Sequence, residues 1–304
     1  MTVAASTTPP ELDRPRGGAS GERRDTARSH RPRSPLLVIG LALVGLVVVV
    51  ALAAPILASH APTGVSGRSL ATPSASHWLG TDDSGRDIFA ELVYGARASL
   101  VVGVVSGCLA MLGAVALGVL PALVGGAADS LSHRLIVFLL ALPALPLIIL
   151  IGSLAGNRRT AVILVIAFLG VAPNARVLRG QAQSLRRRGF IGASRGFGGG
   201  PLYVLRRHLL PGLGPLLVVR FVNWAGVAIG LEAGLSFLGL GDPSGVSWGM
   251  MMNRALNQPG IYFSQMWTWW VIPPGLAITL TVLGFTFVGV GLEPSFNPRW
   301  LRTS

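Results

Sequence analysis

Residues 176–207 read RVLRGQAQSLRRRGFIGASRGFGGGPLYVLRR and contain eight arginines but no aspartate or glutamate. Long apolar segments flank this basic segment on both sides. Short, positively charged loops between membrane spans are retained in the cytoplasm. We therefore predict a membrane protein in which this segment lies on the cytoplasmic side and presents a cationic surface to a partner.

The composition of the whole chain agrees with a multi-span membrane protein. Of its 304 residues 51% are hydrophobic and only 12% are charged, about half the charged fraction of a soluble domain. The net charge of +13 comes from arginine alone, since the sequence has no lysine. Because the arginines lie beside apolar segments, membrane orientation and anionic headgroups explain them, and we expect no nucleic-acid partner.

Six apolar segments are long enough to cross a hydrocarbon core of about 30 Å at about 1.5 Å per helical residue. An even number of spans places both termini on one side, which the basic segment identifies as the cytoplasm. Residues 1–34 are then predicted to be a disordered basic cytoplasmic tail. Residues 59–97 form an external loop and residues 179–210 a cytoplasmic one. The predicted spans are Leu36–Ala58, Ala98–Val124, Leu135–Ala155, Thr160–Leu178, Pro211–Leu235 and Trp270–Leu292.

Glycines divide the cytoplasmic loop. The run Gly198-Gly199-Gly200-Pro201 interrupts any helix, and proline suits the first turn of the next one. We expect two short helices joined by a glycine hinge, the second of which ends at Pro211. The fourth span is expected to continue directly into the first of these helices.

Few residues have the chemistry of an active site or a metal site. The single cysteine, Cys108, and five scattered histidines predict no metal site or cofactor on this chain. Two segments around Ser194 and Ser247 match G-x-S-x-G, but a hydrolase also needs His and Asp partners and a preceding strand. Without lysine there can be no G-x-x-x-x-G-K-[ST] phosphate loop. If ATP drives this protein, another chain hydrolyses it, and we expect no enzyme here.

Glu232 is the one acidic residue deep in a predicted span, where a carboxylate is costly. It could serve a proton or a substrate, as in an ion-gradient-driven secondary transporter, but no second membrane acid is present to relay protons. We interpret it as a structural carboxylate. Arg220 lies about 18 Å away along one helix and cannot pair with it.

A polar external segment precedes the second span. It is dense in turn-forming residues and has two interpretations, a folded and capped surface turn or a docking surface for a receptor. Its candidate residues are His77, Trp78, Gly80, Thr81, Asp82, Gly85, Arg86 and Asp87.

Several motifs resemble one family of bacterial membrane proteins. HWLGTDDSGRD (77–87), YGARASL (94–100), AR-x-x-RGQ (175–181), LEAGLSFLGLG (231–241) and SWG (247–249) occur in the order seen in ABC importer permeases for dipeptides, oligopeptides and nickel. They resemble the second permease of each pair. The resemblance covers most of residues 77–292. It implies a type I importer fold, with residues 35–304 as one transmembrane permease domain.

The resemblance also implies how the cytoplasmic loop works. In this family an E-A-A-x3-G-x9-I-x-L-P pattern docks into a groove of the ATPase. Four positions match it: Ala193, Gly198, Leu210 and Pro211. Three depart from it: Gly192 replaces the glutamate, Ser194 the second alanine and His208 the isoleucine.

The same resemblance implies the partners and the location of the chain. The partners are a second permease, two ATP-binding subunits that carry ATP and magnesium, and an extracytoplasmic solute-binding protein. The location implied is the bacterial inner membrane.

Overall fold

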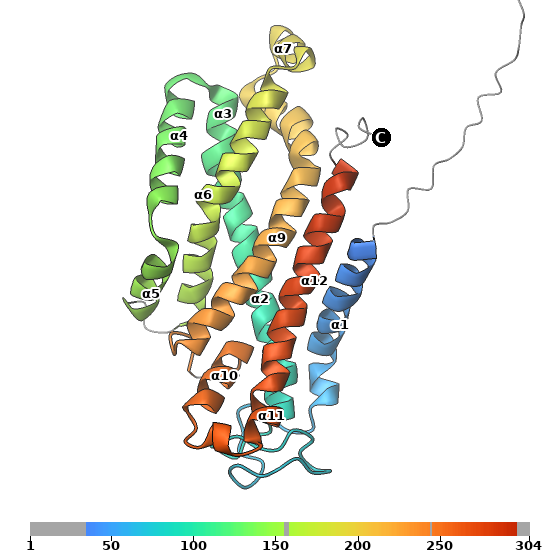
Figure 1. The fold of residues 1–304 in the computed structure, drawn as a ribbon. Helices are drawn as coiled ribbons and strands as arrows, with labels where there is room; N and C mark the ends of the chain where they lie inside the picture. The colour runs from blue at the N-terminus through green and yellow to red at the C-terminus, as the bar shows by residue number, and fades with distance from the viewer. Residues whose placement is uncertain (1–34, 155–157, 244, 297–304) are drawn as a thin grey trace, which may run out of the picture. The chain divides into compact units, whose positions relative to one another are not determined.

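The computed structural model describes residues 35–154, 158–243 and 245–296 (Figure 1). Regular structure in these ranges is helical, and two isolated β-bridges join Val65 to Arg86 and Thr81 to Asp87. The predicted tail, residues 1–34, lies outside the described residues. The elements are α1 (Pro35–Leu57), α2 (Ile88–Ala114), η1 (Val115–Val119), α3 (Leu120–Val124), α4 (Gly126–Ala141), α5 (Ala144–Leu154), α6 (Arg159–Arg186), α7 (Gly189–Gly196), α8 (Pro201–Val204), η2 (Leu205–Leu209), α9 (Leu210–Phe237), α10 (Trp248–Asn257), η3 (Ile261–Phe263), α11 (Met266–Trp270) and α12 (Ile272–Phe296).

Five of the described helical segments are long and apolar enough to cross a membrane. They are Pro35–Leu57, Ile88–Val124, Arg159–Arg186, Pro201–Phe237 and Met266–Glu293. A sixth span is reached when the bent pair α4–α5 is counted as one. The prediction of an all-α membrane protein is confirmed. The first segment has the predicted length of 23 residues, and the other four are longer than the apolar cores predicted for them.

The third predicted span, Leu135–Ala155, is wrong as a continuous helix. The helix begins earlier, at Gly126, and ends at Ala141, and the next one runs from Ala144 to Leu154 at an angle of 84°. Leu142 between them is extended, with φ −70° and ψ 131°. The cause is Pro143, because the ring of a proline disfavours helical geometry in the residue before it.

The second helix of the cytoplasmic loop does not end at Pro211, contrary to the sequence prediction. It continues from α8 through η2, a π-helical turn, into α9. In the π turn the Leu210 N–H bonds to the Leu205 carbonyl, one residue further back than in an α-helix. A proline ring crowds the carbonyl four residues before it, and the wider turn relieves this before Pro211. η1 has the same form before Leu120-Pro121.

The helices pack closely where glycines face a neighbour. α2 packs against both α6 and α9, and α1 packs against α12. A Cβ on Gly118 would lie 2.5 Å from the Ala175 carbonyl oxygen of α6, and one on Gly40 would lie 2.6 Å from the Val288 nitrogen of α12. Backbones that approach this closely leave no room for a side chain, as is typical of helix pairs in membranes.

The loops and short helices gather at two opposite ends of the bundle (Figure 1). At the α7 end lie α7 and the turn after α3, and the start of α1 and the end of α12 point toward this end. At the α10 end lie α10, α11 and the segment between α1 and α2. The segments predicted to be cytoplasmic and external therefore lie at opposite ends.

Candidate functional site

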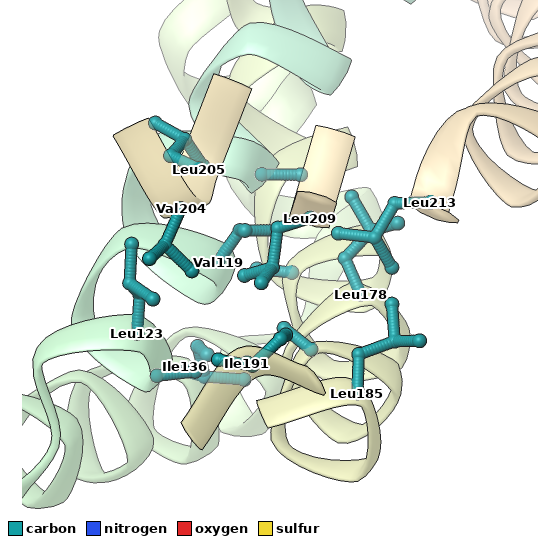
Figure 2. Close-up of a cluster of buried hydrophobic side chains, with 14 residues drawn as sticks. Val119, Leu123, Ile136, Leu178, Leu185, Ile191, Val204, Leu205, Leu209 and Leu213 are labelled. Carbon is teal, nitrogen blue, oxygen red and sulfur yellow. The ribbon is translucent and has the colours of Figure 1, made fainter. Parts of the chain in front are cut away.

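α7 is held to the bundle by one buried side chain. Ile191 is 1% exposed, while the other described side chains of α7 are exposed or half-buried; those of Phe190 and Arg195 are not described. In Figure 2 Ile191 points into a buried apolar cluster with side chains from η1, α3, α4, α6 and the α8–α9 segment. Burying an isoleucine is worth about 1.5–3 kcal/mol. Ile191 therefore links α7 to the ends of the long helices.

The glycine run ends α7 and starts α8. Gly198 has φ +87°, a left-handed conformation, and the Gly199 N–H bonds to the Ser194 carbonyl at 2.9 Å. This is a Schellman motif with Gly198 at the position that glycine usually takes. Gly200 then caps α8, and Pro201 occupies its first turn, as the sequence predicts.

The outer face of α7 and α8 is apolar and basic. Phe197 is 94% exposed, and Leu202 and Tyr203 are also exposed. Four exposed arginines flank them in the sequence: Arg187, Arg188, Arg206 and Arg207. We call this set of seven residues the α7–α8 surface. Exposed large apolar side chains beside positive charges are typical of an interface with a protein partner.

The structure places the six loop residues singled out from the sequence around this surface. Ala193 and Gly198 are exposed, Ser194 is half-buried, and Gly192, where a glutamate was expected from the motif, has open space around it. His208 and Leu210 are half-buried and Pro211 is exposed in the continuous helix. Sequence reasoning missed Ile191, Leu205 and Leu209, although their apolar side chains in a basic loop were a visible signal of a buried face.

A polar brace connects α6 to α4 at the same end. Arg179 donates from Nε and Nη2 to both carboxylate oxygens of Asp129, at 2.7 and 3.0 Å, and Gln183 donates to Oδ2 at 2.8 Å. A bidentate arginine–carboxylate pair fixes orientation as well as distance. The halves of α4 and α6 at the α7 end are therefore expected to move as one unit.

The external segment 77–87 forms a folded, capped turn. Thr81, Asp82 and Asp87 are buried. Asp82 Oδ1 accepts the N–H groups of Ser84 and Arg86 at 2.9 and 2.7 Å, and Asp87 caps α2 by accepting the Phe89 N–H at 3.0 Å. Burial raises the pKa of Asp82, and the two N–H groups oppose this shift. Gly80 and Gly85 both have positive φ and lie against backbone carbonyls.

The remaining residues of this segment divide between its interior and its surface. His77 stacks on His60 with ring centroids 4.8 Å apart, whereas Trp78 is 65% exposed. Arg86 lies 3.8 Å from Glu91, a fully buried carboxylate in the first turn of α2. These buried contacts favour the interpretation as a structural turn and leave Trp78 as its main exposed group.

Glu91 also ties α2 to α10. Arg254 of α10 donates to Glu91 Oε1 at 2.7 Å, and the indole N–H of Trp248 donates to the Leu92 carbonyl at 2.8 Å. The sequence reasoning did not identify this link because 163 residues separate its partners. It holds the short helix α10 against the start of the second span.

Glu232 is 4% exposed and lies between α2 and α9. Its Oε2 accepts the Ser99 hydroxyl at 3.3 Å and its Oε1 accepts the Ser236 hydroxyl at 2.8 Å. Arg220 instead donates to the Asn174 side chain at 2.8 Å, so the predicted lack of a Glu232–Arg220 pair holds. The hydroxyl donors satisfy both oxygens, which fits a structural carboxylate.

Neither G-x-S-x-G serine has the surroundings of a nucleophile. Ser247 caps α10, and its hydroxyl accepts the Met250 N–H at 3.3 Å. Ser194 lies in α7 and its carbonyl belongs to the Schellman motif. Among the residues that the structure describes, no strand of the kind that a hydrolase elbow requires precedes either serine.

Comparison with known proteins gives one consistent result. The family model described as "Binding-protein-dependent transport system inner membrane component" matches residues 114–302, more than half of the chain. A putative peptide permease of Brucella suis is 36% identical over 264 residues, 86% of each chain. The dipeptide transport system permease protein DppC of Alkalihalophilus pseudofirmus is 36% identical over 271 residues, 88% of this chain and 87% of the relative.

A third relative is named for the transport of a different solute. The glutathione transport system permease protein GsiD of Pectobacterium atrosepticum is 36% identical over 228 residues, 75% of this chain and 74% of the relative. These matches confirm the resemblance found in the motifs and give no support to the alternative of a secondary transporter. The chain therefore belongs to the family of binding-protein-dependent transport system inner membrane components, and it is a multi-pass permease subunit.

Proposed function

We propose that this chain is one permease subunit of an ATP-driven importer of peptides or similar small solutes. It forms half of a translocation pathway whose other half is a second permease. Relatives named for the transport of dipeptides and glutathione support the solute class. The observation that carries the proposal is the α7–α8 surface, which supplies a place for an ATPase on a chain that has no lysine for a phosphate loop.

The orientation follows from the positive charges. The α7 end carries the basic segment 176–207, so it faces the cytoplasm. With six spans, both termini lie on this side as well. The α10 end then faces outward and meets the solute-binding protein. Two ATP-binding subunits dock on the cytoplasmic side, one of them through residues 182–210. This chain hydrolyses nothing itself.

The coupling runs from the α7–α8 surface into the long helices. A moving ATPase displaces α7, and Ile191 transmits the displacement to the cluster that contains Leu178 of α6 and Leu209 before α9. Because packed cores respond by shifting as units, the spans tilt together. The open space at Gly192 replaces the acidic contact of the family pattern. The docking groove of the ATPase is therefore expected to be apolar, with acidic residues facing the arginines.

Uptake in cells distinguishes this proposal from its rival. A strain that lacks the chain is complemented with it, and uptake of a labelled dipeptide is measured. Collapse of the ion gradients by ionophore, with ATP maintained, should leave uptake intact, whereas depletion of ATP should abolish it. Uptake that follows the ion gradient would overturn the proposal.

Cross-linking tests the docking surface itself. Phe197→Cys at the α7 end should form a cross-link to the ATPase subunit, and Trp78→Cys at the α10 end serves as the matched control on an exposed aromatic position. Cys108 is changed to Ser in both variants because it is exposed. Equal cross-linking from the two positions, or from Trp78→Cys alone, would contradict the assignment of the two ends.

A further inference from the structure

A cavity of about 350 Å³ lies between α4 and α6, toward the α7 end of these helices. Its lining combines basic and apolar side chains. It is lined by His133, Ile136, Val137 and Leu140 of α4 and by Arg176 and Arg179 of α6. No residue of the α7–α8 surface lines it, so it is separate from the proposed docking site.

The two arginines that line this cavity differ in their contacts. Arg179 is committed to Asp129, and its Nη1 lies 3.3 Å from His133 Nδ1. Arg176 is exposed and makes no hydrogen bond or ion pair within the ranges that the structure describes. Since Asp129 is already neutralised by Arg179, the guanidinium of Arg176 gives the cavity a net positive charge.

A second, apolar cavity of about 200 Å³ shares one lining residue with the first. Leu140 lines both. The second cavity opens at the break between α4 and α5, where Leu142 and Leu145 face Leu169 and Pro173 of α6. One face of α6 therefore changes from apolar to basic between Pro173 and Arg176, within a single turn.

The height of this transition matches the edge of a membrane. Arg176 and Arg179 lie about 26 and 30 Å along α6 from its first residue, Arg159. The hydrocarbon core is about 30 Å thick, so the two arginines reach the level of the headgroups when α6 spans it. Outside the cavity α4 also exposes Leu135 and Phe138, as a lipid-facing helix does.

We propose that this pair of cavities is a binding site for one anionic phospholipid of the cytoplasmic leaflet. The phosphate accepts hydrogen bonds from Arg176 and is close to His133 and Arg179. One acyl chain passes Leu140 and fills the apolar cavity at the α4–α5 break. Basic pockets between helices on the cytoplasmic side are suited to anionic headgroups, and the apolar continuation favours a lipid over a free phosphate.

Native mass spectrometry of the purified full-length chain tests the site. Phosphatidylglycerol and phosphatidylcholine with identical acyl chains are added in equal amounts, and the bound lipids are counted. We expect one phosphatidylglycerol to be retained in preference. Arg176→Gln should weaken its binding about five- to tenfold, the effect of one arginine near a phosphate. Arg134→Gln is the matched control, because Arg134 is exposed on α4 but does not line the cavity.

Two further measurements separate the lipid from other occupants. Leu140→Trp, which narrows the junction of the two cavities without changing charge, should also release the lipid. Inorganic phosphate at millimolar concentration should not compete. Equal effects of Arg176→Gln and Arg134→Gln would show a general attraction to anionic lipid and overturn the site. Full competition by phosphate, unchanged binding in Leu140→Trp, or no preference for phosphatidylglycerol would also overturn it.

Discussion

Two glycines of one turn should respond in opposite directions to the same substitution. Gly198 has φ +87° and Gly200 has φ −68°, and neither would bring a new Cβ within 4 Å of another atom. Alanine at either position therefore meets no steric obstacle from neighbours. The two positions differ in backbone conformation. Comparing Gly198→Ala with Gly200→Ala therefore isolates the free-energy cost of the left-handed conformation.

The magnitudes follow from two terms. A left-handed conformation costs alanine about 1–2 kcal/mol. Replacing glycine also removes conformational freedom from the opened loop, which stabilises the closed form by about 0.4–1 kcal/mol when φ and ψ are compatible. Gly200→Ala should therefore stabilise the turn and Gly198→Ala should weaken it. The entropic term is common to both, so the two variants should differ by about 1–2 kcal/mol, a five- to thirtyfold difference in the opening of α7.

Hydrogen exchange measures this opening directly. The reporting amides are those of Phe197 and Gly199, which bond to the carbonyls of Ala193 and Ser194 at 3.0 and 2.9 Å. Their exchange should be faster in Gly198→Ala than in the wild type and slower in Gly200→Ala. Equal protection in the two variants would refute the reasoning. Gly198→Pro is the extreme case, because proline fixes φ near −65°, and it should uncouple ATP hydrolysis from uptake.

Three further substitutions test the contacts around α7, α10 and Glu232. Ile191→Ala should destabilise the attachment of α7 by about 2–5 kcal/mol and reduce coupled uptake. Ile56→Ala, at an 87% exposed position, is the control and should change stability by less than about 0.5 kcal/mol. Thermal unfolding measures the stability of both variants, and ATPase assays measure their coupling. Arg254→Gln should destabilise the α10 attachment by about 3–5 kcal/mol because it leaves Glu91 buried without its closest partner, and proteolysis of α10 that matches the wild type would contradict this. Glu232→Gln should keep uptake close to the wild-type rate, since an amide oxygen still accepts hydroxyl donors; a complete loss would favour a proton-carrying role.

Local sequence signals predicted much of the helical architecture. The apolar runs located the spans, and Gly198 and Pro201 located the break in the cytoplasmic loop. The same kind of signal is present at Leu142-Pro143. The prediction of the third span rests on the length of the apolar run alone, and it therefore does not include the break. A proline also misled the prediction at Pro211, where a π turn lets the helix continue.

The candidate site could be predicted only in part. The loop residues follow from a motif, and their coupling role stays a prediction. Contacts between distant segments leave no local pattern, which is why Glu91 and Arg254 were not paired in advance. The apolar side chain of Ile191 was a visible signal, but the eight residues of α7, with Phe190 beside Ile191, are too few to establish a period.

The two π turns have a consequence for chimeric transporters. Each adds one residue to a helical turn just before a Leu-Pro pair, at Val115–Val119 and at Leu205–Leu209. One residue corresponds to about 100° of rotation about a helix axis. A loop transplanted from a relative with a plain α-helix at Leu205–Leu209 would turn Phe197 and its neighbours away from the incoming ATPase, even with every contact residue conserved. In a chimera the junction between the two sequences therefore belongs on the membrane side of Pro211. The π turn that sets the rotation of the loop is then transferred together with the loop.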